Sequence, residues 1–180
     1  MAASETTPRA AVSAQKLLPL AYEELCALAR ARLARLGEGF GLSPAELVHE
    51  AYLRVAGDGS AAFDGRRHFF FAVARGMHDI LVESARKKAS LKRGGSYVVV
   101  SGKLDDVPAT EATEELIELD MALKKLERKS SESAQVVLLG HFGGLTHPQI
   151  AAALGLSLAT VERRWRASRD WLRRELSGNV

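Results

Sequence analysis

Hydrophobic residues recur every three to four positions along this chain, which is the spacing of amphipathic α-helices, in successive segments separated by glycines. The repeat predicts a first helix from about Ala14 to Leu36, and glycines at positions 37, 39 and 41 then interrupt it. The predicted buried stripe of this helix consists of Leu18, Tyr22, Leu25, Ala29, Leu33 and Leu36.

A second helix is predicted to begin at Pro44. Ser43 is a good N-cap, Pro44 suits the first helical position, and Glu46 completes a capping box. A glycine-rich segment at positions 57–60 ends the helix. Its predicted buried side carries Val48, Ala51, Tyr52 and Val55, whereas His49, Glu50, Leu53 and Arg54 lie off that side. Leu53 is informative because it is apolar and yet lies outside the stripe.

A third helix is predicted from near Gly65 to about Ala89, with a buried stripe of Phe70, Val73, Met77, Leu81 and Ser84. Three consecutive phenylalanines at positions 69–71 lie near its start. Because neighbouring helical residues point about 100° apart, the three rings cannot all face one core. At least one ring is therefore expected near the surface.

Basic residues follow these aromatic rings, and the combination forms the stacking and phosphate-binding surface that single-stranded DNA favours. We expect stacking by His68, Phe69 or Phe71, and phosphate contacts by Arg75, His78, Arg86, Lys87 and Lys88. The alternative is that the aromatic rings only pack this helix on the first two, and we favour that alternative for Phe70.

The segment from Thr146 to Leu176 predicts two helices joined by a tight turn. Thr146 and Gln149 can form a capping box, Gly155 can adopt a left-handed C-cap, and Ser157 can cap the next helix. A short capped helix, a glycine turn and a longer arginine-rich helix are typical of the helix-turn-helix that binds the DNA major groove. The predicted buried stripe of the longer helix is Leu158, Val161, Trp165, Ser168 and Leu172.

Six arginines lie between positions 163 and 174 of that helix. A solvated face of an ordinary helical bundle is the alternative explanation, but arginine is the residue best shaped to bind guanine edges and phosphates. We expect Glu162, Arg163 and Arg166, near the helix start, to reach base edges. The remaining predicted DNA contacts are Thr160, Arg164, Arg169 and Arg173, with the last three on phosphates, and Trp165 is expected to pack inward on Ile150 and Leu154.

No segment requires a β-sheet, so we predict an all-α protein of two small helical domains joined by an acidic flexible linker. The predicted parts are a disordered tail at residues 1–13, a first domain at 14–95, the linker at 96–113, and a second domain with the helix-turn-helix at 114–178. Acidic residues between Asp105 and Asp120 separate a basic block at residues 86–93 from the arginine-rich helix. This charge pattern indicates two nucleic-acid-facing modules.

Composition and charge limit the function classes. The net charge of +3 and the pI near 9.2 fit a nucleic-acid-binding protein. Cys26 is the only cysteine, which excludes an internal disulfide and fits a reducing compartment. No apolar run reaches the length of about eighteen residues that predicts a transmembrane helix, and no signal peptide is visible. We therefore expect a cytoplasmic protein without membrane insertion.

Catalytic signals are weak. The five histidines are scattered without a second ligand at metal spacing, and a single cysteine excludes a cysteine-based zinc cluster. The chain also lacks a glycine-rich loop with the Gly-Lys-Ser/Thr ending that binds nucleotide phosphates. We predict a protein that is not an enzyme and that needs no metal or cofactor.

The order of these features resembles that of the extracytoplasmic-function (ECF, group IV) sigma factors of bacterial RNA polymerase, from about Ala14 to Leu176. Residues 46–54, Glu-Leu-Val-His-Glu-Ala-Tyr-Leu-Arg, resemble the segment that docks on the polymerase clamp helices. The segment Phe69–Arg93 resembles the one that melts and reads the −10 element, and Thr146–Trp171 resembles the −35 reader. The resemblance implies core RNA polymerase and promoter DNA as partners, and it allows an anti-sigma factor.

The resemblance further implies polymerase contacts by Glu46, His49, Glu50, Leu53 and Arg54. Many members of the family carry Asn, Asp and Arg where this chain has Gly76, Ile80 and Glu83. The acidic linker is implied to pass near the active-site cleft or the RNA exit path of the polymerase.

The chain is thus interpreted as a sigma factor that binds core polymerase and directs promoter-specific initiation through −10 and −35 recognition. A stand-alone helix-turn-helix transcriptional regulator is the main alternative, but it would normally carry a sensor domain, and the first ~95 residues lack the strand alternation expected of one. A serine recombinase is a further alternative, but it would need a catalytic sheet domain, and no segment of the sequence predicts one.

Overall fold

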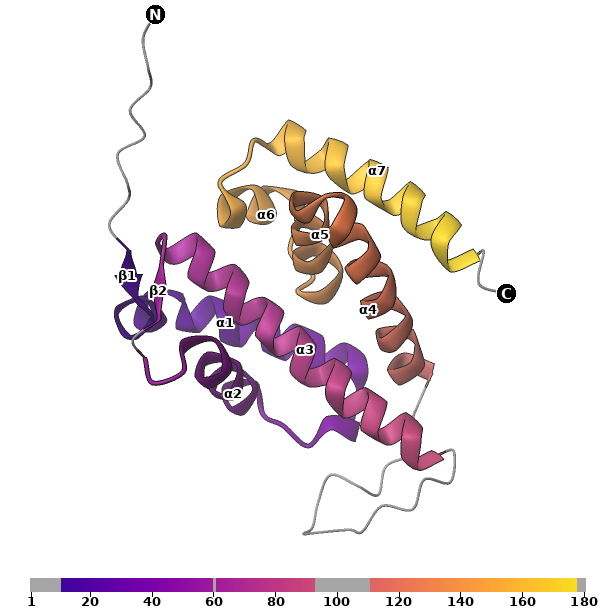
Figure 1. Cartoon of the computed structure of the whole chain (residues 1–180), viewed down its shortest axis with the longest axis horizontal. Helices are drawn as coiled ribbons and strands as arrows, with labels where there is room; N and C mark the ends of the chain where they lie inside the picture. Colours follow the sequence, from indigo (N-terminus) through magenta and orange to yellow (C-terminus); the bar gives the residue numbers. More distant parts are fainter. Residues whose placement is uncertain (1–10, 60, 93–110, 178–180) are drawn as a thin grey trace, which may run out of the picture.

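The structure, a computed structural model, describes residues 11–59, 61–92 and 111–177. These residues form seven α-helices and one short pair of β-strands (Figure 1). The prediction of an all-α fold is therefore confirmed. Below, the described residues up to 92 are called the N-terminal half, and residues 111–177 are called the C-terminal half.

The N-terminal half consists of α1 (Ala14–Leu36), the 3-10 turn η1 (Glu38–Phe40), α2 (Pro44–Ala56) and α3 (Arg66–Lys92). Helix α1 has the predicted bounds, whereas α3 extends past Ala89. Strand β1 (Val12–Ser13) pairs antiparallel with β2 (Ala62–Phe63), with Val12 opposite Phe63. The predicted loose tail of residues 1–13 is wrong for Val12 and Ser13, because this pairing fixes them beside the start of α3.

The buried side of α1 differs from the predicted stripe. Leu25, Ala29 and Leu36 of that stripe are buried, as predicted. Leu17, Ala21 and Leu28 are buried as well, whereas Leu18 and Leu33 are half-buried and Tyr22 is 37% exposed. Apolar residues occupy adjacent positions in this helix, so its periodicity alone leaves the direction of the stripe uncertain by about one residue. Packing against α2 and α3 selects the side that carries Leu17 and Ala21.

Helix α2 begins as its sequence predicts. The Ser43 backbone N–H donates to Glu46 Oε2 at 2.7 Å, and the Glu46 N–H donates to Ser43 Oγ at 3.2 Å, which completes the capping box. Val48 and Ala51 are buried and Tyr52 and Val55 are half-buried, as predicted, and Leu47 and Ala56 are buried as well.

The C-terminal half consists of α4 (Glu111–Lys129), α5 (Ser131–Val137), the π-helical turn η2 (Leu138–Phe142), α6 (His147–Leu154) and α7 (Leu158–Ser177). Helix α4 begins inside the segment that was predicted as linker. The rest of that linker, together with Arg93 and the glycines at 94 and 95, lies outside the described residues. The acidic residues from Glu114 to Asp120, which the predicted bounds place in the second domain, lie in this helix.

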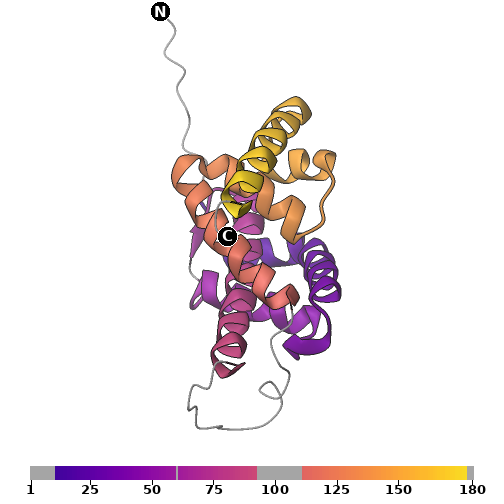
Figure 2. The same cartoon turned by 90° about the vertical axis from the view of Figure 1, so that its right-hand side faces the viewer.

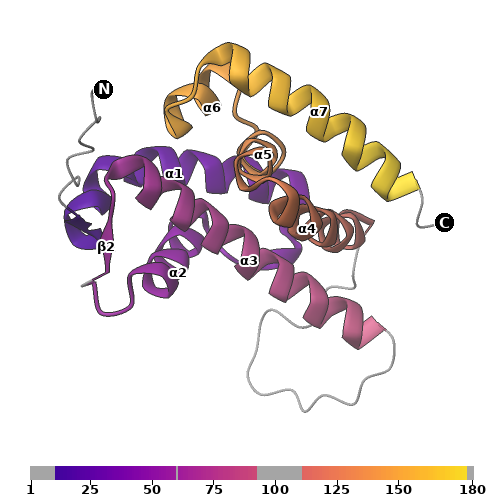
Figure 3. The ribbon, with the colours of Figure 1, turned by 45° about the horizontal axis from the view of Figure 1, so that its top comes forward.

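The two halves pack against each other. Helix α4 lies along α3, and α6 reaches the start of α3 (Figures 1 and 2). The buried side chains of both halves form one continuous cluster, which includes Leu81 of α3, Leu123 of α4 and Phe142 of η2. Figure 3 shows α2 on the side of α3 that faces away from α6 and α7. The structure is thus a closed arrangement in which the C-terminal half covers one face of α3.

Candidate nucleic-acid and polymerase interfaces

Helices α6 and α7 form the predicted helix-turn-helix. The side-chain oxygen of Gln149 accepts from the Thr146 backbone N–H at 2.9 Å and from its hydroxyl at 3.0 Å. Gly155 has φ 67° and ψ 30°, the left-handed conformation in which glycine avoids steric strain. The Thr160 N–H donates to Ser157 Oγ at 3.2 Å and caps α7. The turn geometry is therefore set by the residues that the sequence analysis identified.

The outer face of α7 is available to a partner. The side chains that were predicted to read or contact DNA from this face are exposed: Glu162, Arg163, Arg166, Arg169 and Arg173. Val161 and Ser168 are buried on the opposite face, and Trp165 and Leu172 are half-buried there. Leu158 departs from the predicted buried stripe, since it is 43% exposed at the first turn of the helix.

Three of the residues predicted to contact DNA are engaged within the protein. Arg164 forms an ion pair with Glu132 of α5, and its side chain is 27% exposed. The Thr160 hydroxyl accepts a hydrogen bond from Ser157 at 2.8 Å. Arg169 pairs with the neighbouring Asp170 at 3.8 Å and remains exposed. Arg164 therefore joins α7 to α5 in this structure, and its predicted place on a phosphate is not free.

Trp165 packs inward, as predicted, and it also lies against Gly140 of η2, a contact that was not predicted. A Cβ atom placed on Gly140 of η2 would lie 2.5 Å from Cζ3 of Trp165 and 3.3 Å from Cδ1 of Ile150. The indole ring also lies 5.5 Å from the imidazole of His147, centroid to centroid. Gly140 therefore permits the close approach of η2 to the base of the helix-turn-helix.

The aromatic residues at the start of α3 divide between core and surface. Phe69 has no exposed surface and packs edge-on against Phe63, with ring centroids 5.3 Å apart. Phe70 is also buried, Phe71 is half-buried, and the His68 side chain is 53% exposed. Phe69 is thus a core residue in this structure, because Phe63 and Tyr52 cover its ring. Its expected surface position is wrong, which leaves His68 and Phe71 as the accessible rings.

The basic residues of α3 that were expected to contact phosphates also divide between the surface and the core. Lys87 is exposed and the Arg86 side chain is 47% exposed. His78 has no exposed surface, and Lys88 is buried with its Nζ atom 4.4 Å from the centroid of Phe40. The predicted exposure of His78 and Lys88 is therefore wrong, because α4 covers the former and η1 covers the latter.

Asp120 of α4 covers this region of α3, and it ends the acidic stretch that begins at Asp105 in the sequence. Its carboxylate is buried and accepts from Arg86 at 2.9 Å and Lys124 at 2.8 Å, and it lies 3.3 Å from His78 Nε2. Burial alone would raise the pKa of Asp120, but the hydrogen bonds with His78 and Lys124 outweigh it and lower the pKa to about 2. The carboxylate is therefore ionised at neutral pH.

The place of Asp120 in the sequence predicts that its side chain points to the buried side of α4. It lies between Leu116, Leu119 and Leu123, which form the buried stripe of α4, so a helical periodicity places it inward. A carboxylate at such a position needs charged or hydrogen-bonding partners, because an isolated buried charge is costly. The periodicity does not reveal that two of those partners belong to α3.

The off-stripe residues of α2 form a mixed polar and apolar surface. Leu53 is 54% exposed, and His49 and Glu50 are exposed beside it. Arg54 donates to both carboxylate oxygens of Glu83 on α3, at 2.7 and 2.9 Å. Glu46, the fifth residue of this predicted surface, is exposed and engaged in the capping box.

Gly76 and Glu83 of α3 contact α2 in this chain. A Cβ atom on Gly76 would lie 3.2 Å from Cγ2 of Val55, so glycine permits close packing of the two helices. Ile80 is buried, and Glu83 holds Arg54. Gly76 thus serves the packing of this helix pair, and Glu83 serves its pairing through Arg54.

Within the described ranges, no three metal-ligating side chains converge on one point. None of the helices described there is long and apolar enough to cross a membrane.

Comparison with protein-family models gives a match over residues 10–178 to the model described as ECF sigma factor. The matched region includes α1 to α7 and therefore all of the surfaces described above. No curated protein and no solved structure matches the chain significantly.

Proposed function

Because this chain belongs to the ECF sigma factor family, a family of non-enzymatic transcription initiation factors, we propose that it binds core RNA polymerase and directs it to promoters by reading −10 and −35 elements. The observation that carries the proposal is the helix-turn-helix with an open outer face on α7, within a chain that the family model covers almost throughout.

The −35 element is read by the first turns of α7. Glu162, Arg163 and Arg166 are exposed near the helix start, where residues of a helix-turn-helix enter the major groove. Arginine favours guanine, which offers two acceptors to its planar fork, and a glutamate can accept from the cytosine amine. Arg169 and Arg173 lie further along the helix and bind phosphates, which adds affinity without sequence preference.

The −10 element is held as a single strand on the N-terminal half. His68 and Phe71 supply the accessible rings for stacking, and Arg75, Arg86 and Lys87 supply positive charge along α3. Gly76 and Glu83 of α3 contact α2 in this chain, and Ile80 is buried.

Core polymerase binds the surface of α2 formed by His49, Glu50, Leu53 and Arg54. An exposed leucine surrounded by charged side chains suits a partner interface, in which an apolar contact is flanked by polar ones. The two hydrogen bonds between Arg54 and Glu83 fix the edge of this surface. Glu46 caps the helix and so holds its first turn in place.

Co-purification with core polymerase tests this assignment. Replacing Leu53 with Glu should abolish co-purification, because the exchange puts a charge at the apolar centre of the surface. The matched control is Leu20→Glu on α1, which introduces the same charge at a leucine that is 63% exposed. Leu20→Glu should co-purify like the wild type, and circular dichroism should show that both variants are folded. Equal co-purification of the Leu53 and Leu20 variants would contradict the assignment.

A further inference from the structure

Leu158 is the first residue of α7, and it is 43% exposed. Trp165 and Leu172, which the helical periodicity places on the same side of α7, pack against the buried cluster of the protein. Leu158 instead follows directly after Ser157, whose hydroxyl caps the helix. A leucine that the periodicity assigns to the core therefore stands at the surface, in the first turn of the second helix of the helix-turn-helix.

The surface around Leu158 is the one that we assign to the major groove. Glu162 lies four residues further on, and residues at this spacing are neighbours on one side of a helix. Ala159 and Arg163 are exposed beside this pair, and Arg166 follows one turn later. The exposed leucine is thus bordered by the charged side chains that are proposed to reach base edges.

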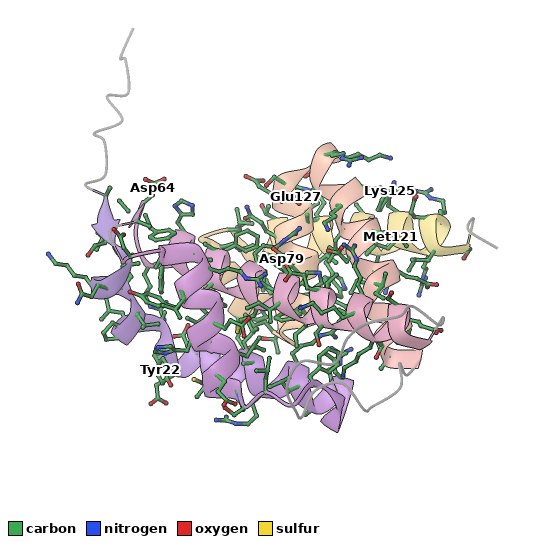
Figure 4. The ribbon with its side chains drawn as sticks, turned by 60° about the horizontal axis from the view of Figure 1, so that its bottom comes forward. Tyr22, Asp64, Asp79, Met121, Lys125 and Glu127 are labelled. Carbon is green, nitrogen blue, oxygen red and sulfur yellow. The ribbon has the colours of Figure 1, made fainter. Side chains whose placement is uncertain are left out.

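Leu176 provides a comparison within the same helix. It is 40% exposed and lies five turns after Leu158, at about 3.6 residues per turn, so the two leucines have the same angle around α7. Glu175, beside Leu176, forms an ion pair with Lys125 on α4, close to the end of α7 (Figure 4). The two leucines thus match in type, angle and exposure, but only Leu158 lies at the end of the helix that enters the groove.

The chemistry of the major groove limits what an exposed leucine can contact there. The base edges offer hydrogen-bond donors and acceptors and one apolar group, the C5-methyl of thymine. Against a donor or an acceptor, a leucine would displace water without replacing its hydrogen bond, which costs free energy. Against a thymine methyl, both apolar groups leave water together, which is favourable.

We propose that Leu158 is a specificity-determining residue of the −35 site and reads one thymine by contact with its C5-methyl group. This inference rests on the proposed function of α7. It adds an apolar contact to the polar readout by Glu162, Arg163 and Arg166, and it requires an A·T pair in the −35 element. One helical turn rises about 5.4 Å and one base-pair step about 3.4 Å, so the thymine lies within two base pairs of the base that Glu162 contacts.

Deoxyuridine, which differs from thymidine only in lacking the methyl group, is the probe. Holoenzyme with the wild-type chain first selects a −35 element from a randomised library. Each thymine of either strand in that element is then replaced singly by deoxyuridine. At one position the replacement should weaken binding of the wild-type holoenzyme about fourfold, the factor for loss of one buried methyl-sized group. With Leu158→Ala, thymidine and deoxyuridine at that position should bind equally, because the contacting side chain is gone.

The matched control is Leu176→Ala, the same exchange at the same angle of the helix. It should keep the wild-type loss of affinity with deoxyuridine. Alanine is the strongest helix former, so both variants should fold, which circular dichroism checks. Both should also co-purify with core polymerase like the wild type. A loss of co-purification for Leu158→Ala alone would assign Leu158 to a protein interface and overturn the proposal.

Three further results would overturn the reading by Leu158 and leave the proposed function untouched. They are a selected −35 element without thymine, no loss of affinity at any deoxyuridine, and losses that are the same for the wild type and Leu158→Ala. A selection that yields no preferred −35 sequence would overturn the proposed function of α7, and this inference with it. A loss that is present in the wild type and Leu176→Ala and absent in Leu158→Ala supports the proposal.

Discussion

His78 Nε2 lies 3.3 Å from Oδ1 of Asp120, and neither side chain has exposed surface. An ionised carboxylate can only accept, so Nε2 carries the proton and Nδ1 is the acceptor of a neutral imidazole. Among the residues that the structure describes, none forms a hydrogen bond with Nδ1. Protonating it would bury an unpaired donor together with a charge. Burial accordingly lowers the pKa of His78, and the hydrogen bond to Asp120 only partly opposes this shift.

This relationship predicts a pH dependence of stability. Because the pKa of His78 is lower in the folded chain than the ordinary value of 6.5, the unfolded chain binds more protons as the pH falls below that value. The contribution of His78 to stability is therefore present above about pH 6.5 and is lost toward acidic pH. His78→Gln retains a group that can bond to Asp120 but does not titrate. Thermal unfolding from pH 7.5 to 5.5 should show a smaller loss of Tm for this variant than for the wild type.

The control for that experiment is His68→Gln, the same exchange at a side chain that is 53% exposed. Its Tm should follow the wild type across the pH range. Parallel Tm curves for His78→Gln and the wild type would show that His78 does not gain a proton when the chain unfolds. The proposed pH dependence of the His78–Asp120 pair would then be wrong.

Base readout and phosphate binding by α7 can be separated with two exposed arginines. Arg163→Ala should cost about 1–3 kcal/mol at one or two −35 positions and relax the preference there. Arg173→Ala should weaken binding to all sequences alike and reduce the salt dependence by about one unit. Binding of holoenzyme to a randomised −35 library measures both effects. A uniform loss for both variants would mean that α7 is an electrostatic anchor rather than a reader.

The aromatic residues of α3 should differ in their effect on promoter melting. Phe71→Ala, at a half-buried ring, should reduce permanganate reactivity of the −10 strand, since loss of a stacking ring costs about 1–3 kcal/mol. His68→Ala should act in the same direction. Phe69→Ala removes a ring with no exposed surface, so it should lower the free energy of unfolding instead. Normal melting by both the Phe71 and His68 variants would exclude them as stacking residues.

Gly140 should be intolerant of a side chain. A Cβ atom there would lie 2.5 Å from Trp165, so Gly140→Ala forces η2 away from α7 and should lower the free energy of unfolding by about 1–3 kcal/mol. Gly76→Ala is the comparison, because its Cβ would meet Val55 at 3.2 Å and needs a shift of only a few tenths of an ångström. Urea denaturation of the two variants should show the larger loss for Gly140→Ala, and the reverse order would contradict the packing account.

The sequence predicted features that depend on local signals. The bounds of α1, the capping box at Ser43 and the turn at Gly155 follow from helix periodicity and from residues within three or four positions of one another. The exposed outer face of α7 also followed from its own periodicity. The family match over residues 10–178 confirmed the resemblance that these features carried.

Features that depend on distant partners could not be predicted. Phe69 is buried because Phe63 and Tyr52, from other elements, cover it. His78 is buried because α4 brings Asp120 to it across 42 positions of sequence. Both residues belong to a helix with apolar groups on several sides, so the pattern of α3 alone does not tell which side another element covers.

Transcription by purified core polymerase on a library of genomic fragments tests the central claim most directly. With the chain added, the account predicts defined RNA 5′ ends whose upstream DNA shares one element near −35 and another near −10, and none of these products without it or with Leu53→Glu. The same 5′ ends from core polymerase alone, or products that share no upstream element when the chain is present, would contradict the claim that this protein gives the polymerase its promoter specificity.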